Sequence, residues 1–163
     1  MPTTPEITER AAQPYVAIAA KITMEQLAGL ADRLGEVFGW LAERGLAPAG
    51  PPFFRYNVID MERQLNVEAG VPVPTAVRGD DRVTAGVLPA GRYATAIHVG
   101  HYGGLIGAVA NLLQWAEAQG LEWDESAADD GEHWGCRLEI YLTNPAEQPD
   151  ATKWETQLAF RLK

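Results

Sequence analysis

The segment from Trp134 to Leu142, WGCRLEIYL, brings a carboxylate and a phenol close together. Its alternating apolar residues predict a strand. Side chains alternate between the two faces of a strand, so Glu139 and Tyr141 share one face with Arg137. A carboxylate in an aromatic cleft can hold a cationic ligand or take a proton as a general base. Equally, Glu139 can be an exposed residue that pairs with Arg137 or with a base on the next strand.

The opposite face of this strand is apolar, and we expect it to pack against the helices. Its members are Trp134, Cys136, Leu138, Ile140 and Leu142. Cys136 is the only cysteine of the chain. A thiol among apolar side chains is typically structural rather than nucleophilic, so we expect no catalytic role for it.

Aromatic residues near this strand are candidates for the walls of a ligand cleft. Tyr56, Tyr102, Tyr141, Phe54 and Trp134 lie on or beside expected strands and turns rather than within helices. In a cleft they would offer apolar area and cation–π contacts to a ligand. Ordinary packing of a sheet accounts for aromatic residues at such places equally well, and both interpretations remain open.

Other catalytic or cofactor chemistry lacks a matching pattern. His98 and His101 have the spacing of metal ligands on a helix, but they lie at the end of an expected strand. His133 is distant in the sequence. Neither a glycine-rich phosphate loop nor a serine nucleophile elbow is present. We therefore predict no metal site and no cofactor.

The composition restricts the partners of the protein. The chain has 163 residues and a formal net charge of −9, with a pI near 4.7, and this length suits one domain. Such an acidic surface disfavours nucleic acid and anionic lipid. The sequence has no apolar run long enough to span a membrane and no signal peptide at its start. A single cysteine fits a reducing compartment, so we expect a cytoplasmic protein that binds neither nucleic acid nor membranes.

Two parts of the chain predict the same succession of elements. A loose arm is expected over residues 1–14. The first part then predicts strands at 15–22, 53–59 and 65–73, and a helix from a capping box at Thr23 to Gly45. A polar turn over 74–82 separates the parts. The second part predicts strands at 83–88, 92–99, 134–142 and 156–162, a helix at 105–119 and an acidic solvated loop at 121–132.

This internal repeat predicts the fold. The half-modules cover about 15–75 and 83–163, and Val67-Glu68 is expected to correspond to Leu138-Glu139. One half with a single helix cannot cover its own sheet, so the two should form a single domain over 15–163. We predict an α+β fold with a mostly antiparallel sheet, two helices on one face and a groove at the pseudo-twofold seam.

Seven short motifs follow one another along residues 15–162. They are PFFRY at 52–56, VEAGVPV at 67–73, LPAGRY at 88–93, HVGHY at 98–102, Trp115, EIYLTNP at 139–145 and WET at 154–156. In this order, and with the duplication, they resemble the GyrI-like small-molecule-binding domain family, which includes the effector-binding half of the BmrR regulator. The resemblance implies two fused SHS2-like modules with a ligand groove between them.

The resemblance also implies which residues line the groove. An acidic residue at the position of Glu139 lies in the groove of relatives, and aromatic residues there stack on flat, often cationic, hydrophobic compounds. Tyr56 and Tyr141 match aromatic groove positions. Tyr102 matches a Gly-x-Tyr motif of the family, with His101 as its middle residue.

Three functions follow as hypotheses. The first is a standalone cytoplasmic binding protein for bulky aromatic or cationic compounds, used in multidrug sensing or sequestration. The second is a hydrolase, because some members resemble enzymes that open cyclopropane rings of DNA-alkylating natural products. Glu139 would then act as general base, and Tyr56 or Tyr102 would hydrogen-bond the carbonyl where charge develops. The third is an inhibitor of a protein partner such as DNA gyrase.

Overall fold

The computed structural model describes residues 3–60 and 62–163, and it contains two α-helices and ten strands within these residues. The helices are α1 (Leu27–Glu43) and α2 (Leu105–Ala118). The strands are β1 (Glu6–Arg10), β2 (Gln13–Ile22), β3 (Phe53–Ile59), β4 (Leu65–Pro72), β5 (Thr84–Leu88), β6 (Gly91–Val99), β7 (Glu125–Ala128), β8 (Gly131–Trp134), β9 (Arg137–Tyr141) and β10 (Glu155–Arg161). Short 3₁₀ helices cover Met24–Gln26, Tyr102–Gly104 and Ala151–Lys153.

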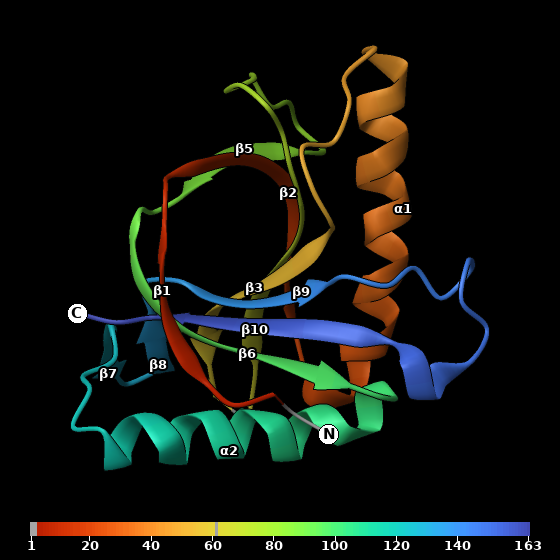
Figure 1. Ribbon diagram of the computed structural model, residues 1–163. Coiled ribbons are helices and arrows are strands. Elements are labelled where there is room, and N and C mark those ends of the chain that lie inside the picture. The colour runs from red at the N-terminus through yellow and green to blue at the C-terminus, as the bar shows by residue number, and fades with distance from the viewer. Residues whose placement is uncertain (1–2, 61) are drawn as a thin grey trace.

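One curled sheet forms the centre of the molecule. Its strand order is β1-β6-β10-β9-β3-β4-β2-β5, and β8 joins it at β3 while pairing with β7. Every pair between described strands is antiparallel. The sheet bends into an open ring and both helices lie outside it (Figure 1). This confirms the predicted α+β fold with two helices on one face. No helix in the described ranges is long and apolar enough to cross a bilayer.

The two halves are related strand by strand across the β3–β9 pair. The first half contributes β3-β4-β2 and the second contributes β9-β10-β6, so β3 corresponds to β9 and β4 to β10. The expected match between Val67-Glu68 and Leu138-Glu139 is therefore wrong, because these pairs lie on non-equivalent strands. The strands that lead into the halves are exchanged: β1 pairs with β6, and β5 pairs with β2.

The N-terminal segment differs from the expected loose arm. Residues 6–10 form β1, which is in register with β6 from Glu6↔Thr95 to Arg10↔Gly91. The hydroxyl oxygens of Thr8 and Thr95 lie 3.1 Å apart across the pair. Without β1, the outer edge of β6 would present unpaired N–H and C=O groups to water. Because Pro5 and Pro14 lie on either side of β1 rather than within it, the ladder is not broken.

The acidic segment at 121–132 is also more ordered than expected. Much of it forms the β7–β8 hairpin, which turns at residues 129–130, and Gly131 begins β8 with a φ of +124°. The strand expected over 134–142 is divided, since Trp134 ends β8 and Arg137 begins β9. Between them, Gly135 lies against the carboxylate of Asp124, which pairs with Arg161 at 2.7 Å. A side chain at 135 would overlap this carboxylate, so the glycine permits the break.

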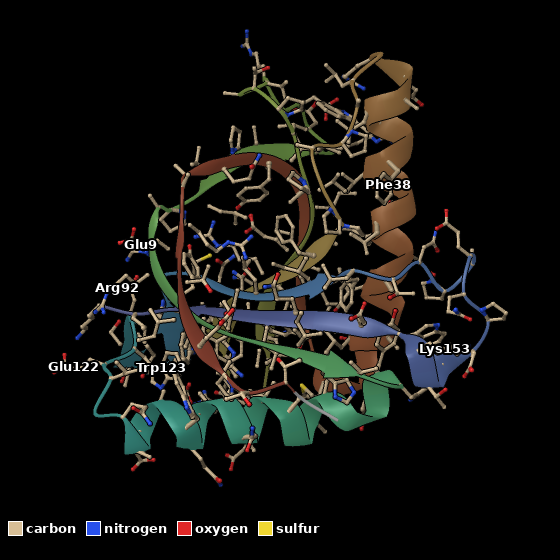
Figure 2. All side chains as sticks on the ribbon, in the orientation of Figure 1. Glu9, Phe38, Arg92, Glu122, Trp123 and Lys153 are labelled. Atoms are coloured by element: carbon tan, nitrogen blue, oxygen red, sulfur yellow. The ribbon has the colours of Figure 1, made fainter. Side chains whose placement is uncertain are left out.

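Apolar residues form cores on both sides of the sheet. Between the sheet and the helices lie Phe54, Tyr56, Val67, Leu112 and Phe160, with their neighbours. Inside the ring lie Phe53, Tyr93, Cys136, Leu138 and Ile140, where side chains fill the space that the strands enclose (Figure 2). The apolar face of β9 therefore packs inside the ring. Our expectation that this face meets the helices is wrong, because the curl gives the sheet a second interior.

The helices begin and end as their sequences predict. Gln26 Oε1 accepts a hydrogen bond of 3.0 Å from the backbone N–H of Thr23, as a capping box requires. Gly45 and Gly120 follow α1 and α2 with φ values of +66° and +72°, a conformation that favours glycine. The N-terminal ends of the two helices approach each other beside the seam of the halves (Figure 1).

Candidate ligand groove

The floor of a groove is formed where the two halves meet. β3 and β9 pair there in the register Phe54↔Glu139. Residue alternation turns Phe54 and Tyr56 of β3 toward the helices, while Arg55 points into the ring. On β9 the same side carries Arg137, Glu139 and Tyr141. The groove therefore takes its polar floor from the face of β9 that we expected to point away from the helices.

Both helices and one loop supply the walls. Lining residues on or next to α1 are Met24, Leu27, Ala28, Ala31, Leu34, Gly35 and Phe38, and those on or next to α2 are Tyr102, Leu105, Ile106 and Val109. The loop after β9 contributes residues 142–145 and Glu147. Small residues on α1 leave room above the floor, and the groove has a volume of about 1040 Å³. This is enough for a drug-sized molecule.

Apolar side chains remain exposed on the rim of this groove. Phe38, labelled on α1 in Figure 2, is 37% exposed, Ile106 is 75% exposed and Leu142 is 40% exposed. Leaving large apolar groups in water is unfavourable, so they favour an apolar occupant.

The carboxylate of Glu139 is held by two phenols. Its Oε1 atom accepts hydrogen bonds from the hydroxyl groups of Tyr56, at 2.9 Å, and Tyr141, at 3.1 Å. Its Oε2 atom has no hydrogen-bond partner among the described residues. Burial raises the pKa of Glu139, while the two phenols and Arg137 act in the opposite direction. The result is one carboxylate oxygen fixed by two phenols and a second one that no described residue engages.

One of the two phenols that hold Glu139, Tyr141, is itself packed among aromatic rings. The ring of Tyr141 makes edge contacts with Phe54, at a centroid distance of 5.2 Å, and with Tyr102, at 5.7 Å. Tyr102 in turn lies 4.9 Å from Trp154. Burial and the nearby charge of Glu139 raise the pKa values of Tyr56 and Tyr141 well above the usual value. Both tyrosines are therefore neutral donors at physiological pH.

A second carboxylate in the sheet, that of Glu68, differs from Glu139 in its hydrogen-bond partners. Glu68 of β4 points into the ring, where its two oxygens accept hydrogen bonds from the Tyr15 hydroxyl at 2.7 and 3.0 Å. The Nε atom of Arg55 lies 4.0 Å from Glu68, and Arg55 also donates to the hydroxyl of Tyr15 at 3.0 Å. Both oxygens of Glu68 are therefore occupied within the protein, whereas one oxygen of Glu139 is not.

Most residues that the sequence suggested for a site come together here. Glu139, Tyr56, Tyr141, Tyr102 and Phe54 all line the groove, and their role in binding remains a prediction. Trp134 does not line it. The break at Gly135 takes Trp134 out of the alternation of β9, and its ring packs against Trp123 and Phe160 at centroid distances of 5.6 and 5.7 Å.

Arg137 is a groove residue that sequence reasoning did not identify as part of the site. It was expected only as a salt-bridge partner for Glu139, yet no ion pair joins the two within 4.0 Å. Its guanidinium carbon lies over the rings of Trp134, at 4.8 Å, and Phe160, at 4.5 Å. The signal in the sequence was its position, two residues before Glu139 on the same face of β9.

The histidines have local structural contacts. The Nε2 atom of His98 lies 3.0 Å from the carbonyl of His101, and Nδ1 of His101 accepts from the N–H of Gly103 at 2.9 Å. His133 pairs with Asp130 at 2.6 Å. Across residues 3–60 and 62–163, no cluster of three or more histidine, cysteine or acidic side chains could hold a metal ion.

Solved structures of other proteins share this fold. The EcmrR C-terminal domain matches with a TM-score of 0.77 and 18% identity over 98% of this chain and 97% of its own. The EcmrR chain in a complex with DNA also matches with a TM-score of 0.77 and 19% identity. This match covers 98% of the present chain and 57% of the EcmrR chain. The chain thus spans little more than half of that EcmrR chain.

Two further structures match across nearly the whole chain. SAV2435 bound to tetraphenylphosphonium has a TM-score of 0.67 and 10% identity, over 99% of this chain and 94% of its own. A hydrolase from Listeria innocua matches with a TM-score of 0.61 and 17% identity, over 98% of this chain and 91% of its own. At these identities the likeness shows the fold alone.

The family follows from the sequence itself. No curated protein sequence matches the chain significantly. The family model described as a GyrI-like small molecule binding domain matches residues 3–163, which is almost the entire chain. The duplicated fold, the groove at its seam and this match agree, and the chain belongs to the GyrI-like small-molecule-binding domain family.

Proposed function

We propose that the groove binds bulky, flat, apolar compounds that carry a positive charge, and that Glu139 provides the counter-charge. The observation that carries this proposal is the free Oε2 atom of Glu139 on the floor of an apolar groove of about 1040 Å³. A cation about 4 Å from this carboxylate would gain about 4 kcal/mol at an effective dielectric constant near 20. The aromatic side chains add cation–π attraction of about 0.5–2 kcal/mol.

One structure with this fold supports a bulky aromatic cation as the ligand. SAV2435 is bound to tetraphenylphosphonium, a bulky aromatic cation, in a structure with the same fold. For this chain, such binding would serve the sensing or sequestration of drug-like compounds. We place it in the cytoplasm, because the chain's single cysteine, Cys136, is buried as a free thiol.

The test is a titration with ethidium, a flat aromatic cation, followed by fluorescence. We expect micromolar affinity for the wild type and a loss of at least about tenfold in Glu139→Gln, which keeps the shape but removes the charge. The matched control is Glu36→Gln on the exposed side of α1, where Glu36 pairs with Arg33. Equal ethidium affinity in all three proteins would remove Glu139 from the proposal.

A second candidate function uses the same carboxylate as a general base. Burial raises the pKa of Glu139, which makes it a better proton acceptor, and Glu139 lines the groove. In a hydrolysis, Glu139 would take a proton from water while the water oxygen bonds to a cyclopropane carbon. The ring C–C bond would break, its electrons passing to a conjugated carbonyl that Tyr102 could stabilise. Mass spectrometry of a cyclopropane-bearing alkylator would show the water adduct, and its absence with binding intact would refute this function.

A further inference from the structure

We propose that Arg137 is a second ligand-binding group, and that the groove selects compounds carrying both a positive charge and an anionic or strong acceptor group such as a carboxylate. This inference rests on the proposed function and narrows its ligand class from aromatic cations to flat zwitterions. It depends on where the guanidinium lies, on what occupies it, and on its spacing from Glu139.

The guanidinium of Arg137 lacks a partner of its own. It lines the groove, and among the described residues its side chain makes neither a hydrogen bond nor an ion pair within 4.0 Å. Burial lowers the pKa of Arg137, but an arginine remains charged at physiological pH. A charged group removed from bulk water is costly unless it is paired. A ligand acceptor would supply the missing partner.

Two aromatic rings border this group. The guanidinium carbon lies 4.8 Å from the ring centroid of Trp134 and 4.5 Å from that of Phe160. These two rings are inclined at 61° to each other, so they hold the guanidinium through cation–π contacts from two directions. The N–H groups of a guanidinium form a fork that recognises a carboxylate through two parallel hydrogen bonds. Trp134, which does not line the groove, would thus act as a support for Arg137.

The nearest carboxylates are held by other residues. Tyr56 and Tyr141 both donate to Oε1 of Glu139. Glu132 accepts a hydrogen bond of 3.2 Å from Nε1 of Trp134. Neither carboxylate forms an ion pair with Arg137 within 4.0 Å. The groove therefore presents a positive and a negative group side by side rather than an internal salt bridge.

The spacing of the two groups matches a single ligand. Residues two apart on a strand lie about 7 Å from each other along its axis. A flat ring system with an amine at one side and a carboxylate at another covers this span. A simple cation would meet attraction from Glu139 and repulsion from Arg137, so it would use only part of the site.

The test compares two dyes that share one ring system. Rhodamine B is a zwitterion with a free carboxylate, and its ethyl ester is a cation. We expect the wild type to bind rhodamine B at least about tenfold more tightly than the ester, since a hydrogen-bonded charge pair forms only with the acid. In Arg137→Gln, binding of rhodamine B should weaken by about tenfold, while binding of the ester should strengthen.

Opposite changes for the two dyes cannot come from a misfolded groove, which would weaken both. Arg137→Lys keeps the positive charge but loses the two parallel N–H donors of the guanidinium. It should retain part of the preference for rhodamine B over its ester. Arg33→Gln, on the exposed side of α1, is the matched control and should leave both affinities unchanged.

The outcomes separate this inference from the proposed function. If the wild type binds both dyes equally and Arg137→Gln changes neither, Arg137 has no ligand role, while binding that depends on Glu139 still supports the proposed function. If ethidium binds the wild type but neither rhodamine does, this inference fails and the proposed function stands; if none of the three dyes binds, both proposals fail.

Discussion

Replacing Glu139 by glutamine should stabilise the ligand-free protein while it weakens the binding of cations. The free energy of unfolding changes because the carboxyl group of Glu139 lies in a largely apolar groove, where burial raises its pKa, and no cation lies within 4.0 Å of it among the described residues. Glutamine has the same length, and its carbonyl can accept the hydrogen bonds that Tyr56 and Tyr141 now donate to Oε1.

The size of the effect follows from two opposing contributions. Removing a carboxylate from water costs several kcal/mol, even after the protein relaxes around it. Two hydrogen bonds to a charged acceptor return about 1.5–3 kcal/mol each, against about 0.5–1.5 kcal/mol each for a neutral acceptor. The difference leaves Glu139→Gln about 1–2 kcal/mol more stable at neutral pH. In a chain of this length that raises the Tm by about 2–8 °C.

The stability difference between Glu139→Gln and the wild type should depend on pH. Because the pKa of Glu139 is raised above its usual value of 4.5, the folded state favours the protonated acid. The contribution of Glu139 to stability is therefore fully present below pH 4.5 and is lost as the pH rises through its folded-state pKa. Glutamine has no such loss, so the advantage of Glu139→Gln should be small at pH 4 and largest at pH 8.

The assay is thermal unfolding of both proteins between pH 4 and pH 8, without ligand. Glu36→Gln serves as the control, since Glu36 lies on the exposed side of α1 and pairs with Arg33 outside the groove. A Glu139→Gln protein that is equally or less stable than the wild type at pH 8 would refute the assignment of Glu139 as a buried, uncompensated charge.

Two further predictions concern the phenols and the N-terminal strand. Tyr56→Phe and Tyr141→Phe each remove a hydrogen bond that lowers the pKa of Glu139. Ethidium binding should therefore reach its half-maximum at a higher pH. An unchanged pH profile would argue that the two phenols do not control the pKa of Glu139. Removal of residues 1–10 should lower the free energy of unfolding by several kcal/mol and cause self-association, because it exposes the edge of β6. Urea unfolding and size-exclusion chromatography would detect both effects, and a stable monomer would contradict them.

The local signals in the sequence predicted most of the elements. The capping box at Thr23, the glycines after both helices and the alternation along residues 65–73 each depend on neighbouring residues alone. The duplication also predicted the seam, because each half lacks enough helix to cover its sheet. Glu139 and Tyr141 were assigned to one face of a strand by the same local rule, and that assignment is confirmed by the structure.

What the sequence did not predict depends on long-range pairing. Residues 6–10 form a strand only because β6 offers an edge from the other half. Trp134 left the expected alternation because Gly135 lies against Asp124, 11 residues earlier in the chain. The face of β9 was assigned wrongly because an apolar face normally meets the helices. In a curled sheet, the inside of the ring is apolar as well.

This reversal also explains why the two carboxylates of the sheet lie in different surroundings. Glu68 points into the ring, where Tyr15 and Arg55 contact it, so it contributes to the packing of the sheet. Glu139 points to the other side, where the seam between the helices leaves a groove instead of a packed core. The two phenols at Glu139 come from β3 and β9, one from each half. Neither half could supply both hydrogen bonds to Glu139 alone, so the duplication positions the carboxylate as well as forming the groove around it.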